Sequence, residues 1–140
     1  MSEENVQIVR QVVEEFEAGM ERGDPGAAFD TGAIADDYEH ILEVNELEGR
    51  SVWRGRKGFV KFIRTWTEEL DDVSIRVERL TDAGEDRVVA LTGVSATGKG
   101  SGVPVELNLG QVYELEGGRV ARVRNYPSHA EALEAAGLRE

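Results

Sequence analysis

Two histidines and no cysteines limit the chemistry that this sequence can offer. Without cysteine there are no disulfides, no thiolate nucleophile and no Cys-ligated zinc. Because the ordinary pKa of histidine lies near neutrality, His40 is the best candidate for a general base. Tyr38 precedes it by two residues, so the two side chains would share one face of a strand. A metal site on His40 and His129 would need carboxylates to complete it, and we expect no metal.

The net charge argues against several classes of partner. The chain carries 28 acidic and 16 basic residues, a formal charge of −12, which repels nucleic-acid backbones and anionic membranes. Its apolar runs are a few residues long, far short of the roughly 20 that cross a bilayer. The start, Met1-Ser2-Glu3-Glu4, is acidic and unlike a signal peptide. We therefore expect a cytoplasmic protein that binds neither nucleic acid nor membrane.

Helical spacing dominates the first half of the chain. At 140 residues the sequence predicts one domain, residues 1–140. The spacing of apolar residues predicts three helices and one strand here, namely helices over 6–16, from Pro25 onward and over 57–70, and a strand over 38–44. Residues 43–56 predict an irregular loop around Trp53.

The second half changes to two-residue alternation. It predicts four consecutive strands, over 73–80, 87–95, 103–115 and 120–126. Glycine-rich turns between them favour antiparallel hairpins. Ser128 and Glu131 form a capping-box pattern before a last helix over 130–136, which Gly137 ends. We therefore predict an α+β fold, in which three to four helices pack on one face of a strongly curved antiparallel sheet and enclose an apolar hollow.

Three stretches of the sequence resemble one family of small pocket proteins. They are the first helix with Glu17-Ala18-Gly19, the segment Trp-Arg-Gly-Arg-Lys-Gly-Phe over 53–59, and the long run from Val112 to Tyr126 followed by Ala-Leu-Glu-Ala-Ala-Gly-Leu. Together they resemble the SnoaL-like branch of the nuclear transport factor 2-like superfamily. The resemblance implies a half-cone sheet of cystatin-like topology, no cofactor and a homodimer. It does not imply one reaction, because the family hosts isomerases, cyclases, epoxide hydrolases, dehydratases and proteins without known chemistry.

Two catalytic patterns of the superfamily can be compared with this chain. The positions that resemble those of the steroid isomerases are Val12, Leu42 and Gln111, of which only Gln111 could stabilise an oxyanion. The positions that resemble those of limonene epoxide hydrolase carry Tyr38, His40, Asn125, Ala90 and Val88. Neither Ala90 nor Val88 can transfer a proton, which makes epoxide hydrolysis the less favoured reaction.

A polar set remains that the resemblance directs into the hollow: Tyr38, His40, Gln111 and Asn125. We predict these four as catalytic residues. We predict that substrate contacts come from Trp53, Phe59, Phe62, Trp66, Leu107 and Leu109.

Each of these residues also has a structural interpretation. His40 could be bound to a backbone carbonyl and Tyr38 could be a core aromatic, while Asn125 could end a strand and Gln111 could lie at a dimer face. Phe59, Phe62 and Trp66 have the spacing of core residues on a covering helix, and Trp53 could be a pocket lid or be buried.

Two surface features complete the sequence-based expectations. In the strands over 87–115, Val89 and Leu91 oppose Val88 and Ala90, so both faces are apolar. Either the strands are covered twice or the outer face is an interface, and we favour a homodimer through the sheet. An acidic cluster of Glu43, Glu46 and Glu48 is either a solvated face or a rim that favours cationic or neutral ligands over anions.

Three functions are compatible with this sequence. The first is a proton-transfer enzyme, an isomerase, cyclase or dehydratase, acting on a small, largely apolar, oxygenated compound. The second is a binding module that keeps the pocket without the chemistry. The third is a protein-interaction domain, which would need a large exposed apolar patch.

Overall fold

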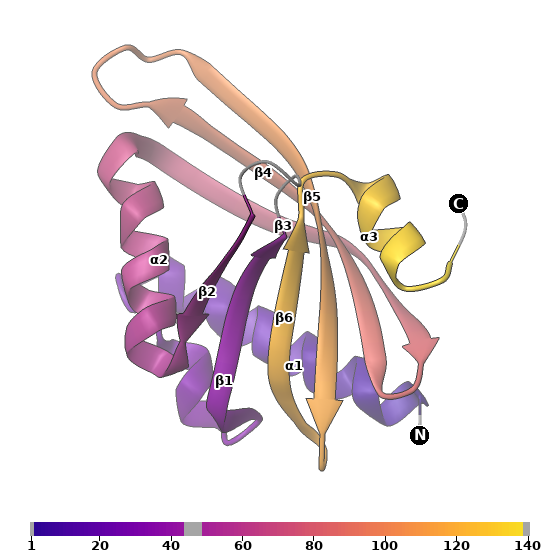
Figure 1. Ribbon diagram of the computed structural model, residues 1–140. Coiled ribbons are helices and arrows are strands. Elements are labelled where there is room, and N and C mark those ends of the chain that lie inside the picture. The colour runs from indigo at the N-terminus through magenta and orange to yellow at the C-terminus, as the bar shows by residue number, and fades with distance from the viewer. Residues whose placement is uncertain (1, 44–48, 139–140) are drawn as a thin grey trace.

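The computed structural model describes residues 2–43 and 49–138. It has the predicted α+β architecture, three α-helices, one short 3-10 helix and a six-stranded curved sheet (Figure 1). The elements in chain order are α1 (Ser2–Glu21), η1 (Ala27–Thr31), β1 (Ile34–Glu43), β2 (Arg50–Arg54), α2 (Gly55–Glu69), β3 (Leu70–Gly84), β4 (Arg87–Gly98), β5 (Pro104–Glu116), β6 (Arg119–Tyr126) and α3 (His129–Ala135). Over the described ranges, no helix combines the length and apolarity that a membrane crossing requires.

The sheet has the strand order β2-β1-β6-β5-β4-β3. The four late strands pair as consecutive antiparallel hairpins, as their glycine-rich turns predict. The sheet is mixed, however, because β1 lies parallel to β6, with His40 opposite Val123. A parallel pair requires a long crossover, which here is the whole stretch between β1 and β6. The residues of a turn predict only the pairing of the two strands that the turn connects, so they could not predict the pairing of β1 with β6.

The sequence-based prediction of an irregular loop over 43–56 was wrong for its last part. Residues 50–54 form the edge strand β2, which pairs antiparallel with β1 and places Trp53 opposite His40. The strand is short, and its Ser51-Val52-Trp53 core contains residues that suit a pleated surface. Val44, the last residue of the strand predicted over 38–44, lies outside the described residues.

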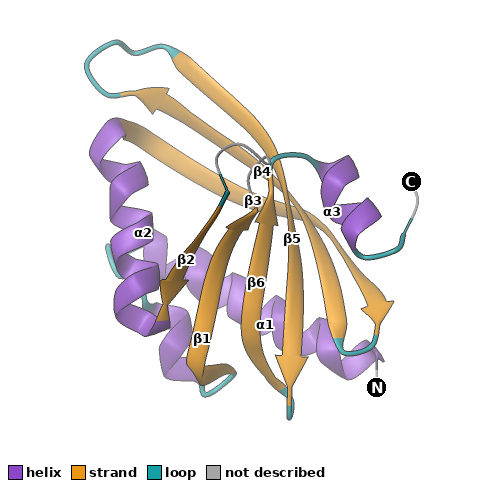
Figure 2. Ribbon diagram, viewed as in Figure 1, coloured by secondary structure: helices purple, strands orange, loops and turns teal. Residues whose placement is uncertain are grey.

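The helices lie on both faces of the sheet, which corrects the expectation of one face (Figure 2). On the concave face, α1 buries Val9, Val12 and Val13 against Val88 and Val120. On the opposite face, α3 buries Ala132, Leu133 and Ala136 against Val89 and Val112. The predicted capping box begins α3, since the Ser128 hydroxyl accepts from the Glu131 amide at 3.2 Å.

The position of α3 also explains why β4 is apolar on both faces. Val88 and Val89 are both almost completely buried, one under α1 and the other under α3. Of the two explanations offered by the sequence, the structure shows coverage on both sides at this point. The apolar alternation therefore no longer argues for a dimer, and the homodimer stays a prediction.

Candidate functional site

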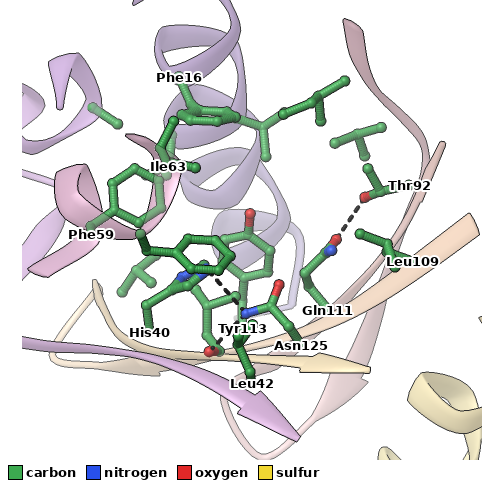
Figure 3. Close-up of a pocket in the computed structure, with 18 of the residues that line it drawn as sticks. Phe16, His40, Leu42, Phe59, Ile63, Thr92, Leu109, Gln111, Tyr113 and Asn125 are labelled. Atoms are coloured by element: carbon green, nitrogen blue, oxygen red, sulfur yellow. Dashed lines mark hydrogen bonds between the residues drawn. The ribbon is translucent and has the colours of Figure 1, made fainter. Parts of the chain in front are cut away.

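A cavity of about 410 Å³ lies between the concave face of the sheet and the helices α1 and α2 (Figure 3). Its volume is within the range of small-molecule sites. Most of its wall is apolar and aromatic, contributed by Val12, Phe16, Phe29, Phe59, Phe62 and Trp66 among others. Polar side chains interrupt this wall at a few positions on β1, β4, β5 and β6 and on the helices α1 and α3. A mostly apolar cavity therefore lies between the sheet and the helices, and its use as a ligand site stays a prediction.

Three of the four predicted polar residues form one hydrogen-bonded series in the cavity wall. The Tyr38 hydroxyl lies 2.7 Å from Nδ1 of His40, and the Asn125 amide nitrogen lies 3.2 Å from Nε2 of the same ring. Two-residue alternation along β1 puts Tyr38 and His40 on the same face, as predicted. The parallel pairing of β1 with β6 brings Asn125 beside them.

The orientation of the Asn125 amide determines which His40 nitrogen carries the proton. The Asn125 Nδ2 group donates to the backbone carbonyl of Ile41 at 3.1 Å, which fixes the amide orientation. Nδ2 can only donate, so Nε2 of His40 must accept and the ring proton sits on Nδ1. His40 Nδ1–H then donates to the Tyr38 oxygen. In this arrangement the Tyr38 hydroxyl keeps its own proton to donate to another partner.

Burial keeps all members of this series neutral. His40 is 7% exposed, and desolvation lowers its pKa from the usual 6.5 to about 3. Phe59 and Phe62 surround the imidazole at ring-centroid distances of 5.0 Å and 4.8 Å. Desolvation likewise raises the pKa of Tyr38 well above its usual value. Tyr38 is therefore a neutral hydrogen-bond donor across the physiological pH range.

Gln111, the fourth predicted polar residue, lies opposite Asn125 on the neighbouring strand. Its side-chain oxygen accepts a hydrogen bond from the Thr92 hydroxyl at 2.6 Å, and both residues are buried. The amide nitrogen of Gln111 keeps its two N–H donors for other partners, and the residue lines the cavity. The interpretation of Gln111 as part of a dimer face does not fit this placement within one chain.

The predicted substrate-contact residues divide into two groups. Phe59, Phe62 and Trp66 from α2 and Leu109 from β5 line the cavity. Trp53 and Leu107 do not. Trp53 packs on Phe62 at a ring-centroid distance of 5.7 Å, and its buried indole N–H has no hydrogen-bond partner among the described residues. Leu107 is 39% exposed near the tip of the β4–β5 hairpin.

Five polar residues that were not predicted as site residues also line the cavity, namely Glu17, Thr92, Tyr113, Tyr126 and Glu131. Tyr113 follows Gln111 by two residues, so strand alternation alone could have placed it on the same face. Thr92 lies two residues after Ala90 on β4, so strand alternation puts these two side chains on the same face. Glu17 lies at the edge of the apolar stripe of α1, next to Phe16. Its position between the two faces of the helix gave no clear signal in the sequence.

The acidic cluster proposed as a cavity rim is only partly described. Glu43 lines the cavity and forms ion pairs with Arg50 at 2.7 Å and Arg124 at 3.0 Å. Glu46 and Glu48 lie outside the described residues. In the described part of the chain, no group of three or more His, Cys, Asp or Glu side chains is placed to hold a metal ion.

Comparisons with known proteins agree with this architecture. A comparison with curated proteins finds no match. Among solved structures, TsrD from Streptomyces laurentii is similar at 25% identity and a TM-score of 0.66, covering 86% of this chain and 87% of its own. An NTF2-like protein from Burkholderia thailandensis is similar at 24% identity and a TM-score of 0.69, covering 87% and 88%.

A third similar structure comes from Jannaschia and is described as a proposed SnoaL-like polyketide cyclase. It has 16% identity and a TM-score of 0.68, and the match covers 89% of this chain and 85% of that one. The family model of the SnoaL-like domain matches residues 13–123, from the middle of α1 through most of β6. That range contains the sheet and most of the cavity wall, and on this basis the chain belongs to the SnoaL-like family.

Proposed function

We propose that this protein is a cofactor-free enzyme that promotes proton transfer on a small, largely apolar, oxygen-bearing compound held in the cavity. Isomerisation, cyclisation and dehydration are the reaction classes that fit. The observation that carries the proposal is the buried series of Tyr38, His40 and Asn125 in an otherwise apolar wall. Buried polar groups of this kind are costly unless they are satisfied, and a guest with an oxygen acceptor would satisfy the remaining donor, the Tyr38 hydroxyl.

Tyr38 is the catalytic residue of this proposal. Its hydroxyl proton is free because the Tyr38 oxygen accepts from His40. In a low-dielectric cavity, a fixed donor stabilises the negative charge that develops on a carbonyl oxygen. His40 and Asn125 are positioning residues, since the contacts of His40 with the Tyr38 hydroxyl and of Asn125 with His40 hold that hydroxyl in one orientation. Gln111 offers a second donor from the adjacent strand.

For a ketone, the simplest step is enolisation. The carbonyl oxygen accepts the Tyr38 hydrogen bond while a water molecule removes a proton from the neighbouring carbon. The hydronium ion so formed protonates the oxygen, which leaves the water and the Tyr38 hydroxyl unchanged. The product is the enol, and reprotonation at carbon from the solvent restores the ketone. In heavy water this cycle replaces hydrogen by deuterium next to the carbonyl.

Deuterium exchange into acetophenone tests the proposal. We expect the wild-type protein to accelerate exchange at the methyl group above the buffer rate, as followed by proton NMR. Tyr38→Phe should lose about 100-fold of that acceleration, the lower end of what a positioned acid contributes. Chemical-shift titration should show that Tyr38→Phe still binds acetophenone. Equal acceleration by the wild type and the variant would overturn the role given to Tyr38.

A binding module without chemistry is the second candidate function. Both ring nitrogens of His40 already have partners, and its pKa of about 3 means that the imidazole takes up no proton near neutrality. That observation favours a rigid wall over a working base. The same experiment separates the two candidates, because a binding module would bind acetophenone and leave its exchange at the buffer rate.

A further inference from the structure

The charged side chains around the cavity are all of one sign. Among the described residues that line it there are three glutamates, Glu17, Glu43 and Glu131, and neither lysine nor arginine. In a site with low-dielectric walls, charges of one sign raise the local concentration of the opposite ion. The cavity therefore disfavours carboxylates and phosphates and favours neutral or cationic guests.

Two of the three glutamates have side-chain partners, of different strength. Glu43 is held between Arg50 and Arg124. Glu131 is exposed and accepts a hydrogen bond from the Ser128 hydroxyl at 2.8 Å as part of the capping box of α3. The charge of Glu43 is offset by two arginines, whereas Glu131 keeps its charge but is exposed, so water screens it. In the less exposed part of the wall, the negative charge that no arginine offsets is therefore that of Glu17.

Glu17 is a half-buried carboxylate without a counter-ion. It forms no ion pair with any residue that the structure describes, and one backbone hydrogen bond from Val77, beside the β-bulge of β3, supports its charge. Desolvation, reinforced by repulsion from Glu14 and Glu21, raises the pKa of Glu17. A carboxylate can accept about four hydrogen bonds, so most of its capacity is unused.

The surroundings of Glu17 suit an organic cation better than a metal ion. One carboxylate cannot supply the six to eight oxygen ligands, roughly, that calcium takes. Aromatic rings of Phe16, Phe59 and Trp66 line the same cavity, and the faces of such rings attract ammonium groups. An amine with an apolar body would satisfy the carboxylate and fill the apolar space together.

We propose that the guest of this cavity is a small amine in its ammonium form, with Glu17 as its counter-ion. This inference rests on the proposed function, because it takes the cavity as the ligand site and names its substrate class. The guest would carry an oxygen to meet Tyr38 and a basic nitrogen to meet Glu17. Glu17 is then a specificity-determining residue, a role that the family resemblance did not assign to it although its stretch of sequence contributes to that resemblance.

Three probes of nearly equal shape and different charge test the inference: benzylamine, benzyl alcohol and benzoate. Their dissociation constants at pH 7 are measured by NMR titration of the full chain. We expect the wild type to bind benzylamine more tightly than benzyl alcohol, and benzoate least. Glu17→Gln should weaken benzylamine about tenfold, the order expected for loss of one partly desolvated ion pair, and leave benzyl alcohol within about twofold.

Glu3→Gln is the matched control. Glu3 lies on the same helix, is exposed, does not line the cavity and is not one of the residues that shift the pKa of Glu17, so its removal changes only the net charge, by the same amount. It should change the affinity for benzylamine by less than about twofold. Equal loss in both variants would mean that only overall charge acts, and would overturn the role of Glu17.

The remaining outcomes separate the inference from the proposed function. If benzyl alcohol binds as well as benzylamine in the wild type, the cavity is a ligand site without preference for cations, and the inference fails alone. If no probe binds, both fail. Circular dichroism of each variant shows whether it is folded, and Glu17→Gln should fold at least as well as the wild type because it removes an unpaired, half-buried charge.

Discussion

The His40 imidazole is surrounded by the rings of Tyr38, Phe59 and Phe62, and this environment controls its protonation. In water the ring would take a proton near pH 6.5, whereas burial lowers its pKa to about 3. The ring therefore serves as a neutral link that accepts from Asn125 and donates to Tyr38. The same residue that looks like a base in the sequence becomes a positioning group in the structure.

This protonation predicts a specific pH dependence of stability. The folded pKa of His40 is below the unfolded one, so the unfolded chain binds more protons as pH falls below 6.5. At pH 5.5 the unfolded state gains about 1.4 kcal/mol from this group. We expect the free energy of unfolding, from urea titrations at pH 7.5 and 5.5, to fall by about that much more in the wild type than in His40→Gln. Identical pH slopes would show that the ring is solvated.

The bond between Thr92 and Gln111 predicts a second effect at this scale. Thr92→Val keeps the shape of the side chain and removes the donor to the buried Gln111 oxygen at 2.6 Å. Leaving a buried acceptor unsatisfied costs about 1–3 kcal/mol, so chemical unfolding should show a loss in that range. The double variant Thr92→Val with Gln111→Leu removes both partners and should recover much of it. A double variant less stable than Thr92→Val would argue against this pairing.

The packing of α3 on the convex face depends on one glycine in β5. A side chain at Gly110 would place its Cβ 2.3 Å from the Cβ of Ala132 and 3.0 Å from the backbone oxygen of Ser128. Such distances are shorter than any ordinary contact, so the helix and strand approach this closely only without a side chain. Gly110 therefore sets the position of α3, which covers Val89 and Val112.

Gly110→Ala should displace α3 and lower the free energy of unfolding by about 1–3 kcal/mol, the usual range for overpacking. Adding Ala132→Gly in the same chain removes the nearest clash and should restore part of the loss. Thermal and urea unfolding measure both variants. A Gly110→Ala protein as stable as the wild type would mean that α3 is not seated on β5 as described.

The elements differ in how well the sequence predicted them, and the reason is physical. The hairpins of β3 to β6 and the start of α3 depend on local turn and capping residues, such as Ser128, and these were predicted. The edge strand β2, the parallel pairing of β1 with β6 and the face covered by α3 depend on contacts between distant residues, and these were missed. Periodicity reports which residues share a face and does not report what covers that face.

In the candidate site, too, the features set by local sequence were predicted, and those set by contacts between distant residues were missed. Two-residue alternation placed Tyr38 and His40 together, and family resemblance added Asn125 and Gln111. The acceptor role of Nε2 could not be predicted, because it depends on the Ile41 carbonyl that orients Asn125. The free carboxylate of Glu17 was missed for a similar reason, since only the fold shows that no cation among the described residues reaches it.

At the scale of the whole molecule, the β4–β5 hairpin extends beyond the helices that cover the sheet (Figure 1). Among the described residues, the exposed large hydrophobic side chains are Val103 at 58% and Leu107 at 39%, both near its tip. We expect this tip to contribute to the predicted homodimer. Sedimentation equilibrium at micromolar concentration should give a dimer for the wild type and a smaller species for Leu107→Asn.

The matched control for the dimer prediction is Asn108→Ala. Asn108 neighbours Leu107, is exposed and points to the other face of the strand, so its removal should leave the dimer intact. A wild-type protein that sediments as a monomer would contradict the prediction directly.

The most direct test of the account is a crystal structure of the protein soaked with acetophenone. The account predicts that the ring lies against Phe59 and Trp66, and that the carbonyl oxygen accepts from the Tyr38 hydroxyl at about 2.5–3.0 Å. Ligand density in the cavity with the carbonyl turned away from Tyr38 would contradict the proposed donor. A cavity filled by its own side chains, with no room for the ring, would contradict the account as a whole.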